Sequence, residues 1–457
     1  MSINQAIHNK ILAQNKTILT ASSILLAVLI FFTNYNIYSC LGLSISAYIM
    51  LRFVLMLGYT IPVIELMLFL AAAQWIIGPF IDYHSKVSHY KMHMYVPELE
   101  YMEITVPAYF VFVIASLNLF RFNPIDIEYF KDYISKNIKL STIFIVLGIV
   151  FNLIQPFAPV SISFVVYLGS NLALVGMGLF FLSKASWTNK LLLTAIGISP
   201  VIVNSIRTGT FHTSIIWGIF IFIFITLNIK LSFFRKALII ATSFLFLTTL
   251  QLIKQDYREQ INSKSFQGNK FELFVDLLLN PQNTEELQSD DELNNVNSRL
   301  NQGWIISKIY ERIPEKKDYL KGETIIGAFE ALVPRFLYPN KKVSGGGKKT
   351  FELLTGIFLL ENTAMGTSLM GEFYGNYGFY GALISFLIWG ILLKLLVSFI
   401  IKRQQIYPIL TFCLPIIFFQ VIKAESDLST VLNHLVKSLA FILVMIFFIK
   451  KLFVKET

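Results

Sequence analysis

Residues 17–33 read TILTASSILLAVLIFFT and contain no charged side chain. A transmembrane helix needs about 20 mostly apolar residues, and 14% of this 457-residue chain is charged, against about 25% in an average soluble domain. The sequence therefore predicts an all-α polytopic membrane protein with about 12 transmembrane helices, and it excludes a water-soluble enzyme, a disordered chain and a disulfide scaffold. The other apolar runs lie near 41–57, 61–81, 104–122, 139–155, 160–182, 191–206, 213–229, 237–253, 377–401, 407–422 and 435–449.

The Lys and Arg residues between the runs predict the orientation of the chain. Segments on one side of the membrane hold fourteen of these residues, and the short segments on the other side hold only Lys86, Lys91, Arg207 and Lys423. Because short loops rich in Lys and Arg stay in the cytoplasm, we expect both termini inside. No small-residue cleavage site follows the first run, so we expect that run to remain as a membrane span.

This orientation places the long segment 254–376 on the extracytoplasmic side. A connection of more than 120 residues is far longer than helix–helix loops usually are and is typical of functional loops. We therefore divide the chain into an N-terminal membrane bundle of about nine helices (1–253), a long loop with short amphipathic or re-entrant helices (254–376), and about three C-terminal membrane helices (377–457). A stretch such as 301–310 has the pattern of a helix lying on the membrane surface.

Several cationic side chains are expected at this outer face. Arg335, Lys341 and Lys342 lie in the Pro-bracketed segment PRFLYPNKK at 334–342, and Arg207 ends the run at 191–206. The planar arginine side chain suits phosphate oxygens, so these four residues are candidate ligands for an anionic headgroup on a lipid tail. The net charge of +10 does not indicate nucleic-acid binding, because the cations are spread over short loops and form no basic stripe.

Acid–base candidates occur on the same side. Glu372 lies in GEFYGNYG at 371–378, and His212 follows Arg207 in a short loop. A carboxylate or imidazole there could deprotonate an acceptor hydroxyl, and the last outer loop adds Glu425, Asp427 and His434 as acceptor-side candidates. We predict no metal site, since the histidines at 84, 89 and 93 are not spaced to share one helix face.

The spans, the long late loop and the segments PRFLYPNK (334–341) and GEFYGNYG (371–378) resemble the Wzy-type O-antigen and oligosaccharide repeat-unit polymerases. The resemblance implies a GT-C-like polymerase fold. It also implies metal-independent and cofactor-independent inverting glycosyl transfer at the outer face of a bacterial inner membrane. A glycan on a polyprenyl-pyrophosphate carrier would be the donor, and a second lipid-linked repeat unit would be the acceptor. Expected partners are membrane lipid, a chain-length regulator and a flippase, with no nucleic acid.

Two other functions stay open. An O-antigen ligase would use the same donor and transfer the glycan to lipid A-core, and nothing in the sequence excludes it. A secondary transporter or lipid-linked oligosaccharide flippase usually has repeat-related halves and broken or charged helices at mid-membrane. The sequence shows no internal repeat, and its polar groups concentrate at one predicted face, which favours the polymerase.

Overall fold

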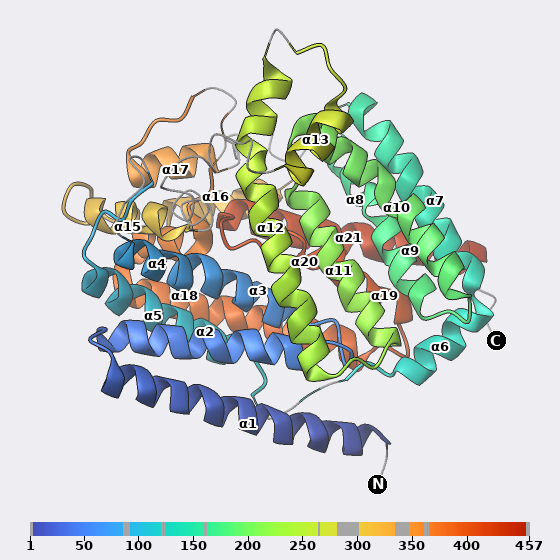
Figure 1. Ribbon diagram of the computed structural model, residues 1–457, viewed down its shortest axis with the longest axis horizontal. Helices are drawn as coiled ribbons and strands as arrows, with labels where there is room; N and C mark the ends of the chain where they lie inside the picture. Colours follow the sequence, from blue (N-terminus) through green and yellow to red (C-terminus); the bar gives the residue numbers. More distant parts are fainter. Residues whose placement is uncertain are drawn as a thin grey trace.

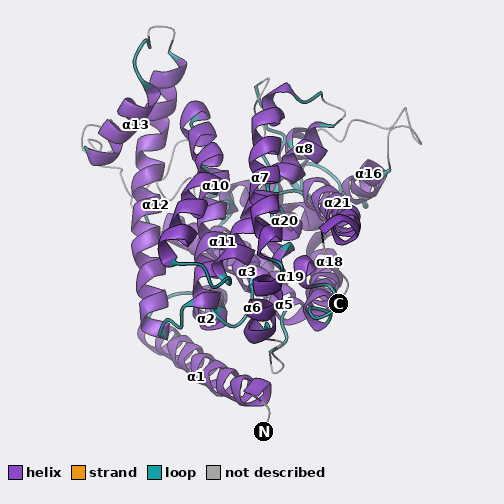
Figure 2. Cartoon of the chain, turned by 90° about the vertical axis from the view of Figure 1, so that its right-hand side faces the viewer, coloured by secondary structure: helices purple, strands orange, loops and turns teal. Residues whose placement is uncertain are grey.

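The computed structural model describes residues 3–85, 92–119, 122, 124–159, 162–263, 266–280, 301–333, 347–360, 363 and 365–453. Within these ranges the regular structure is helical and no strand occurs, as Figure 2 shows. Helices are expected from long apolar runs, because a helix satisfies its backbone polar groups within one segment where no water is present.

Nine helical stretches in the described part of the chain are long and apolar enough to cross a membrane. The predicted polytopic, helical membrane protein is therefore confirmed, whereas the number twelve and the orientation stay predictions. The nine stretches comprise α1 (Ile3–Phe32), α2 (Ile37–Met56), α3 (Val63–Ala72) with η1 (Ala73–Ile77) and α4 (Gly78–His84), α5 (Glu98–Ser116), α7 (Ile138–Ile154) with η2 (Gln155–Phe157), α8 (Ser163–Ser170) with α9 (Leu172–Phe181), α10 (Trp187–Thr208), α18 (Ser368–Lys402) and α21 (Leu428–Phe453).

The other three apolar runs form helices of different kinds. α11 (His212–Asn228) is shorter than the nine, and α12 (Phe233–Asn262) extends nine residues beyond the run at 237–253. The run at 407–422 does not form one continuous helix, because it folds as α19 (Pro408–Phe412) and α20 (Leu414–Phe418) with a break at Cys413. Proline lacks the amide hydrogen that would continue a helix but is tolerated in its first turn, and each short helix has a proline there.

The long segment contains α13 (Lys270–Leu279), α15 (Gly303–Arg312), α16 (Glu323–Leu332) and α17 (Lys348–Thr355), and α6 (Ile127–Lys136) is a short helix elsewhere. The expectation that 301–310 lies on the membrane surface is wrong. α15 is buried along most of its length and packs against α18. A Cβ atom on Gly371 would lie 2.5 Å from the terminal methyl group of Ile309, so the two helices pack closely at this glycine.

α18 begins earlier than the predicted span at 377–401 and contains a break at Gly378. Gly378 has φ +69° and ψ −163°, a conformation that glycine adopts without steric cost. The carbonyl groups of Gly375 and Asn376 accept hydrogen bonds from the amides of Leu320 and Lys321, which satisfies backbone groups near the break. Residues 368–376 thus belong to the helix, although the sequence analysis placed them in the long segment before the span.

Figure 1 shows how the helices are arranged. α15, α16 and α17 lie together on the left, and α6 and α7 lie on the right. α12 rises between these regions toward α13, and α1 lies along the bottom next to α2.

Candidate functional site

The turn between α20 and α21, residues 423–428, is the centre of the candidate site. Its sequence is KAESDL, and the Ser426 amide donates to the Lys423 carbonyl at 3.2 Å. Asp427 then caps α21, because its Oδ1 accepts a hydrogen bond from the Thr430 amide at 2.7 Å. Aspartate is among the preferred N-cap residues, so the local sequence explains why α21 begins here.

Glu372 reaches this turn from α18. Its Oε2 accepts a hydrogen bond from the Leu428 amide at 2.7 Å, and the side chain is 1% exposed. The first turn of a helix presents free amide groups and a partial positive charge, so the start of α21 stabilises this carboxylate. Glu372 is therefore buried inside a helix, and it does not lie in the loop where the sequence analysis expected it.

Asp427 connects the long segment to the same turn. Its Oδ2 accepts a hydrogen bond from the Gly347 amide at 2.9 Å, immediately before α17. Gly347 has φ +48°, and a Cβ there would lie 2.6 Å from the Met365 carbonyl oxygen. A Cβ on Gly366 would lie 2.0 Å from the Glu425 carbonyl oxygen. Both glycines thus allow the end of the long segment to pack directly on the turn.

His212 and Glu425 form the exposed part of the site. His212 is the first residue of α11, and its Nε2 lies 3.8 Å from Glu425 Oε1. The side chains keep 48% and 31% of their surface exposed, respectively, so a ligand could reach both. Lys423 lies on the same turn, and burial lowers the pKa of its ammonium group to about 8, although the nearby Glu425 carboxylate acts in the opposite direction.

Four of the predicted site residues thus gather at one turn although they come from distant parts of the chain. They are Glu372, His212, Glu425 and Asp427. Comparison with models of known protein families, with curated proteins and with solved structures found no match. No group of three or more His, Cys, Asp or Glu side chains that could hold a metal occurs among the described residues, and the prediction of a metal-free site stays a prediction.

The predicted pyrophosphate ligands are only partly described. Arg207 lies in the last turn of α10, exposed, with Nη2 3.4 Å from Asn204 Oδ1, and its carbonyl group accepts a hydrogen bond from Lys270 of α13. Arg335, Lys341 and Lys342 lie outside the described residues. Whether Arg207 and Arg335 converge on one ligand therefore stays a prediction.

His434 occupies a different environment from the other acceptor-side candidates. It lies within α21, is 2% exposed, and its Nε2 is 2.7 Å from the Ile416 carbonyl oxygen. The rings of Phe164, Tyr167 and Phe419 surround the imidazole. His434 thus joins α21 to α20 in the protein interior. Its role on the acceptor side stays a prediction.

Two lysines near the site were not among the predicted site residues. Lys423 is the only Lys or Arg in the last outer loop, which is a signal that the sequence does contain. Lys254 of α12 lies close enough to His212 to act on it electrostatically, but nothing in the sequence indicates that the end of α12 reaches α11 at this point. Both lysines add positive charge beside the exposed His212 and Glu425 side chains.

Proposed function

We propose that the chain is a metal-independent glycosyltransferase that polymerises polyprenyl-pyrophosphate-linked oligosaccharide repeat units at the outer face of a bacterial inner membrane. The observation that carries this proposal is the gathering of an exposed imidazole, a carboxylate and a lysine at the turn 423–428, beside the end of the long segment. The sequence resemblance to Wzy-type polymerases supplies the substrate class. The products would be O-antigen, capsule or exopolysaccharide.

In this proposal His212 is the general base. Its imidazole is accessible and faces Glu425 through Nε2, so Nδ1 is the nitrogen that remains to take a proton. The acceptor hydroxyl transfers its proton to His212 while its oxygen attacks the anomeric carbon of the donor. The bond between that carbon and the pyrophosphate oxygen breaks, and the electron pair leaves with the lipid pyrophosphate. Burial and the nearby Lys423 lower the pKa of His212 to about 4, and the Glu425 carboxylate acts in the opposite direction. Glu425 thus stabilises the imidazolium that forms, because a nearby opposite charge favours the charged state.

The cations would stabilise the departing pyrophosphate. Charge that develops on a leaving group is stabilised most by positive groups already held in place. Lys423 and Arg207 are the described candidates, and Arg335 and Lys341 are candidates outside the described residues. Arg335 and Lys341 lie in the sequence between α16 and Gly347. The residues on both sides support the assignment, because α16 packs along α21 and the Gly347 amide donates a hydrogen bond to Asp427.

Glu372 has a different role from the one that its residue type alone indicates. Its burial and its bond to the Leu428 amide leave it without access to an acceptor hydroxyl. We therefore assign Glu372 as a positioning residue, which holds the start of α21 and with it the turn that carries Glu425. His212 is the stronger candidate for the base, although the sequence analysis left both residues open.

The experiment is complementation of a deletion strain, read as the length distribution of the surface glycan. His212→Ala should reduce polymerisation about 10²- to 10⁴-fold, the usual contribution of a general base, at unchanged protein level. His84→Ala is the matched control, since His84 ends α4 and contacts no residue of the turn in the structure. A normal ladder of chain lengths in the His212 variant would refute the assignment of the base.

The deletion itself tests the reaction. Loss of a polymerase leaves single repeat units attached to lipid A-core, whereas loss of an O-antigen ligase leaves the core without any repeat unit. Turnover of purified lipid-linked donor in detergent, where no transport can occur, separates both enzymes from a flippase. A deletion strain with unchanged glycan would remove the proposed function altogether.

A further inference from the structure

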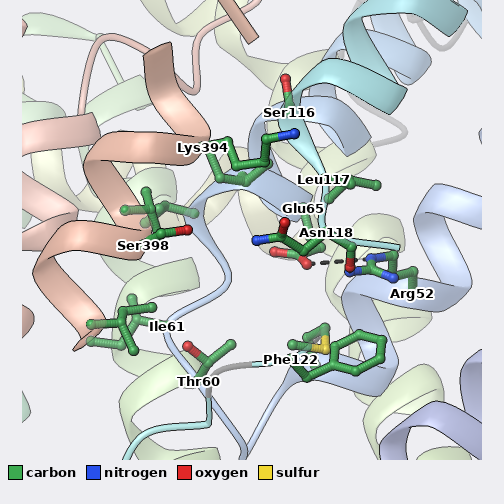
Figure 3. A pocket seen from close by; sticks show the side chains of 15 residues that line it. Arg52, Thr60, Ile61, Glu65, Ser116, Leu117, Asn118, Phe122, Lys394 and Ser398 are labelled. Atoms are coloured by element: carbon green, nitrogen blue, oxygen red, sulfur yellow. Dashed lines mark hydrogen bonds and ion pairs between the residues drawn. The ribbon is translucent and has the colours of Figure 1, made fainter. Parts of the chain in front are cut away.

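A polar cavity of about 70 Å³ lies between α2, α3, α5 and α18. Its wall contains no residue of the turn 423–428, and the break at Gly378 separates Lys394 from Glu372 within α18. Figure 3 shows the side chains of Thr60, Asn118 and Ser398 turned toward the same space as Glu65. Nothing in the proposed glycosyl transfer uses this cavity.

The Arg52 guanidinium and the Glu65 carboxylate form a buried pair on one side of the cavity. Arg52 Nε lies 3.4 Å from Glu65 Oε1, and Arg52 is 2% exposed. The remaining Arg52 nitrogens donate to Asn15 Oδ1 at 2.9 Å and to the Asn118 carbonyl oxygen at 3.0 Å. Arg52 is therefore fully engaged, and its charge is fixed beside the cavity and balanced by Glu65.

Lys394 supplies a second and uncompensated positive charge. It lines the cavity eight residues before the end of α18, and its ammonium group has no carboxylate partner within the part of the chain that the structure describes. A charged side chain within a membrane span is costly and is a functional-site candidate for that reason. Over Arg52, Glu65 and Lys394 the cavity wall carries one net positive charge.

Hydrogen-bond donors without partners line the same space. Thr60 is 5% exposed, and its Oγ1 makes no hydrogen bond to any described residue. The side chains of Asn118 and Ser398 also line the cavity and have no partner in the described ranges. A buried polar group without a partner costs free energy, so a bound group that accepts a hydrogen bond from Thr60 is expected to stabilise the structure, and the half-buried Asn118 and Ser398 side chains can donate to the same group.

We propose that this cavity binds a phosphate group, with Lys394 as its cationic ligand and Thr60, Asn118 and Ser398 as hydrogen-bond donors. A water molecule needs about 10–15 Å³ of such space, so a cavity of about 70 Å³ has room for roughly five heavy atoms, the number in a phosphate group. Two sources share this chemistry: the headgroup of a phospholipid and free inorganic phosphate. The Arg52–Glu65 pair holds Asn118 in position through the bond to its carbonyl group.

Binding to the purified full-length chain tests both sources. In one arm, inorganic phosphate is added at constant ionic strength and the thermal unfolding midpoint is measured against chloride. In the other arm, native mass spectrometry compares phosphatidylglycerol with diacylglycerol, which lacks the phosphate. We expect the unmodified chain to bind its ligand in one of the two arms. In that arm the Lys394→Gln variant should bind about tenfold more weakly, which is the loss expected for one hydrogen bond to a charged group.

Lys402→Gln is the matched control, because Lys402 is the exposed last residue of the same helix and should bind like the unmodified chain. If Lys394→Gln does not fold, Ser398→Ala tests the same cavity without removing a charge, and we expect binding about threefold weaker. The proposal is overturned if neither ligand binds, or if the cavity variant and Lys402→Gln lose binding equally. Either result would leave a cavity that holds water only.

Discussion

The Lys423 side chain is held against an aromatic ring, with its Nζ 4.9 Å from the centre of the Phe419 ring. Burial lowers its pKa to about 8, well below the ordinary value of a lysine. The group is therefore charged below pH 8 and becomes neutral as the pH rises through that value. If Lys423 helps to bind the pyrophosphate, donor turnover should fall as the pH rises above about 8.

The Lys423→Arg variant isolates this effect, because a guanidinium stays charged throughout the accessible pH range. We expect the alkaline limb of the pH profile of kcat/KM to move upward by at least one pH unit. Lys321→Arg, on the loop before α16, is the control and should leave the profile in place. An alkaline limb at the same pH in Lys423→Arg and in the unmodified chain would contradict a role for this ammonium group.

At the scale of single residues, the sequence nominates candidate side chains but does not show what surrounds them. His212 and Glu372 are candidate bases, and Glu425 and Asp427 acceptor-side candidates, because they are expected at one membrane face. The structure places all four at one turn. The distinction between exposed His212 and buried Glu372 depends on tertiary packing. The bonds from the Leu428 and Gly347 amides involve backbone groups, which leave no mark in the amino-acid sequence.

At the scale of elements, apolar runs predict where helices occur and local chemistry decides how they end. Pro415 lies in the first turn of the second of two short helices into which an apolar run of adequate length divides. α18 extends ten residues before Gly378, since amides from 320 and 321 satisfy carbonyl groups near the break. A single sequence does not show such long-range partners, so the predicted start of this helix was too late.

The element that depends most on one side chain is the start of α21. Asp427→Ala removes the N-cap, at a cost of about 1 kcal/mol, and leaves the Gly347 amide unpaired, at roughly 1–3 kcal/mol more. We expect a lower thermal unfolding midpoint, measured by tryptophan fluorescence in detergent. Asp427→Asn should lose less, because its amide group retains one acceptor oxygen.

Asp132→Ala provides the comparison for this prediction. Asp132 pairs with Lys136 on α6, but both side chains are more than 60% exposed, and exposed ion pairs contribute about 0–1 kcal/mol. The thermal unfolding midpoint of Asp132→Ala should therefore stay close to that of the unmodified chain. Equal midpoints for Asp427→Ala and Asp132→Ala would show that the cap does not hold α21 and α17 together.

At the scale of the whole molecule, the proposed function requires that the long segment face the outside. The two native thiols, Cys40 and Cys413, are 0% exposed, and buried thiols are unreactive, so single introduced cysteines can report the orientation. Gln267 lies between α12 and α13 and Gln405 between α18 and α19, and both are exposed. In spheroplasts, a membrane-impermeant maleimide should label Gln267→Cys, whereas Gln405→Cys should react only after the membrane is opened.

The reverse labelling pattern would have consequences beyond the topology. It would place the turn 423–428 in the cytoplasm, away from a donor that is polymerised outside, and the glycosyltransferase proposal would fail with the orientation. The phosphate site at Lys394 would survive, because it is argued from an uncompensated charge and unpaired donors around a cavity. The cavity lies toward the opposite end of α18 from Glu372. A reversed orientation would therefore change only which leaflet of the membrane supplies a phospholipid to it.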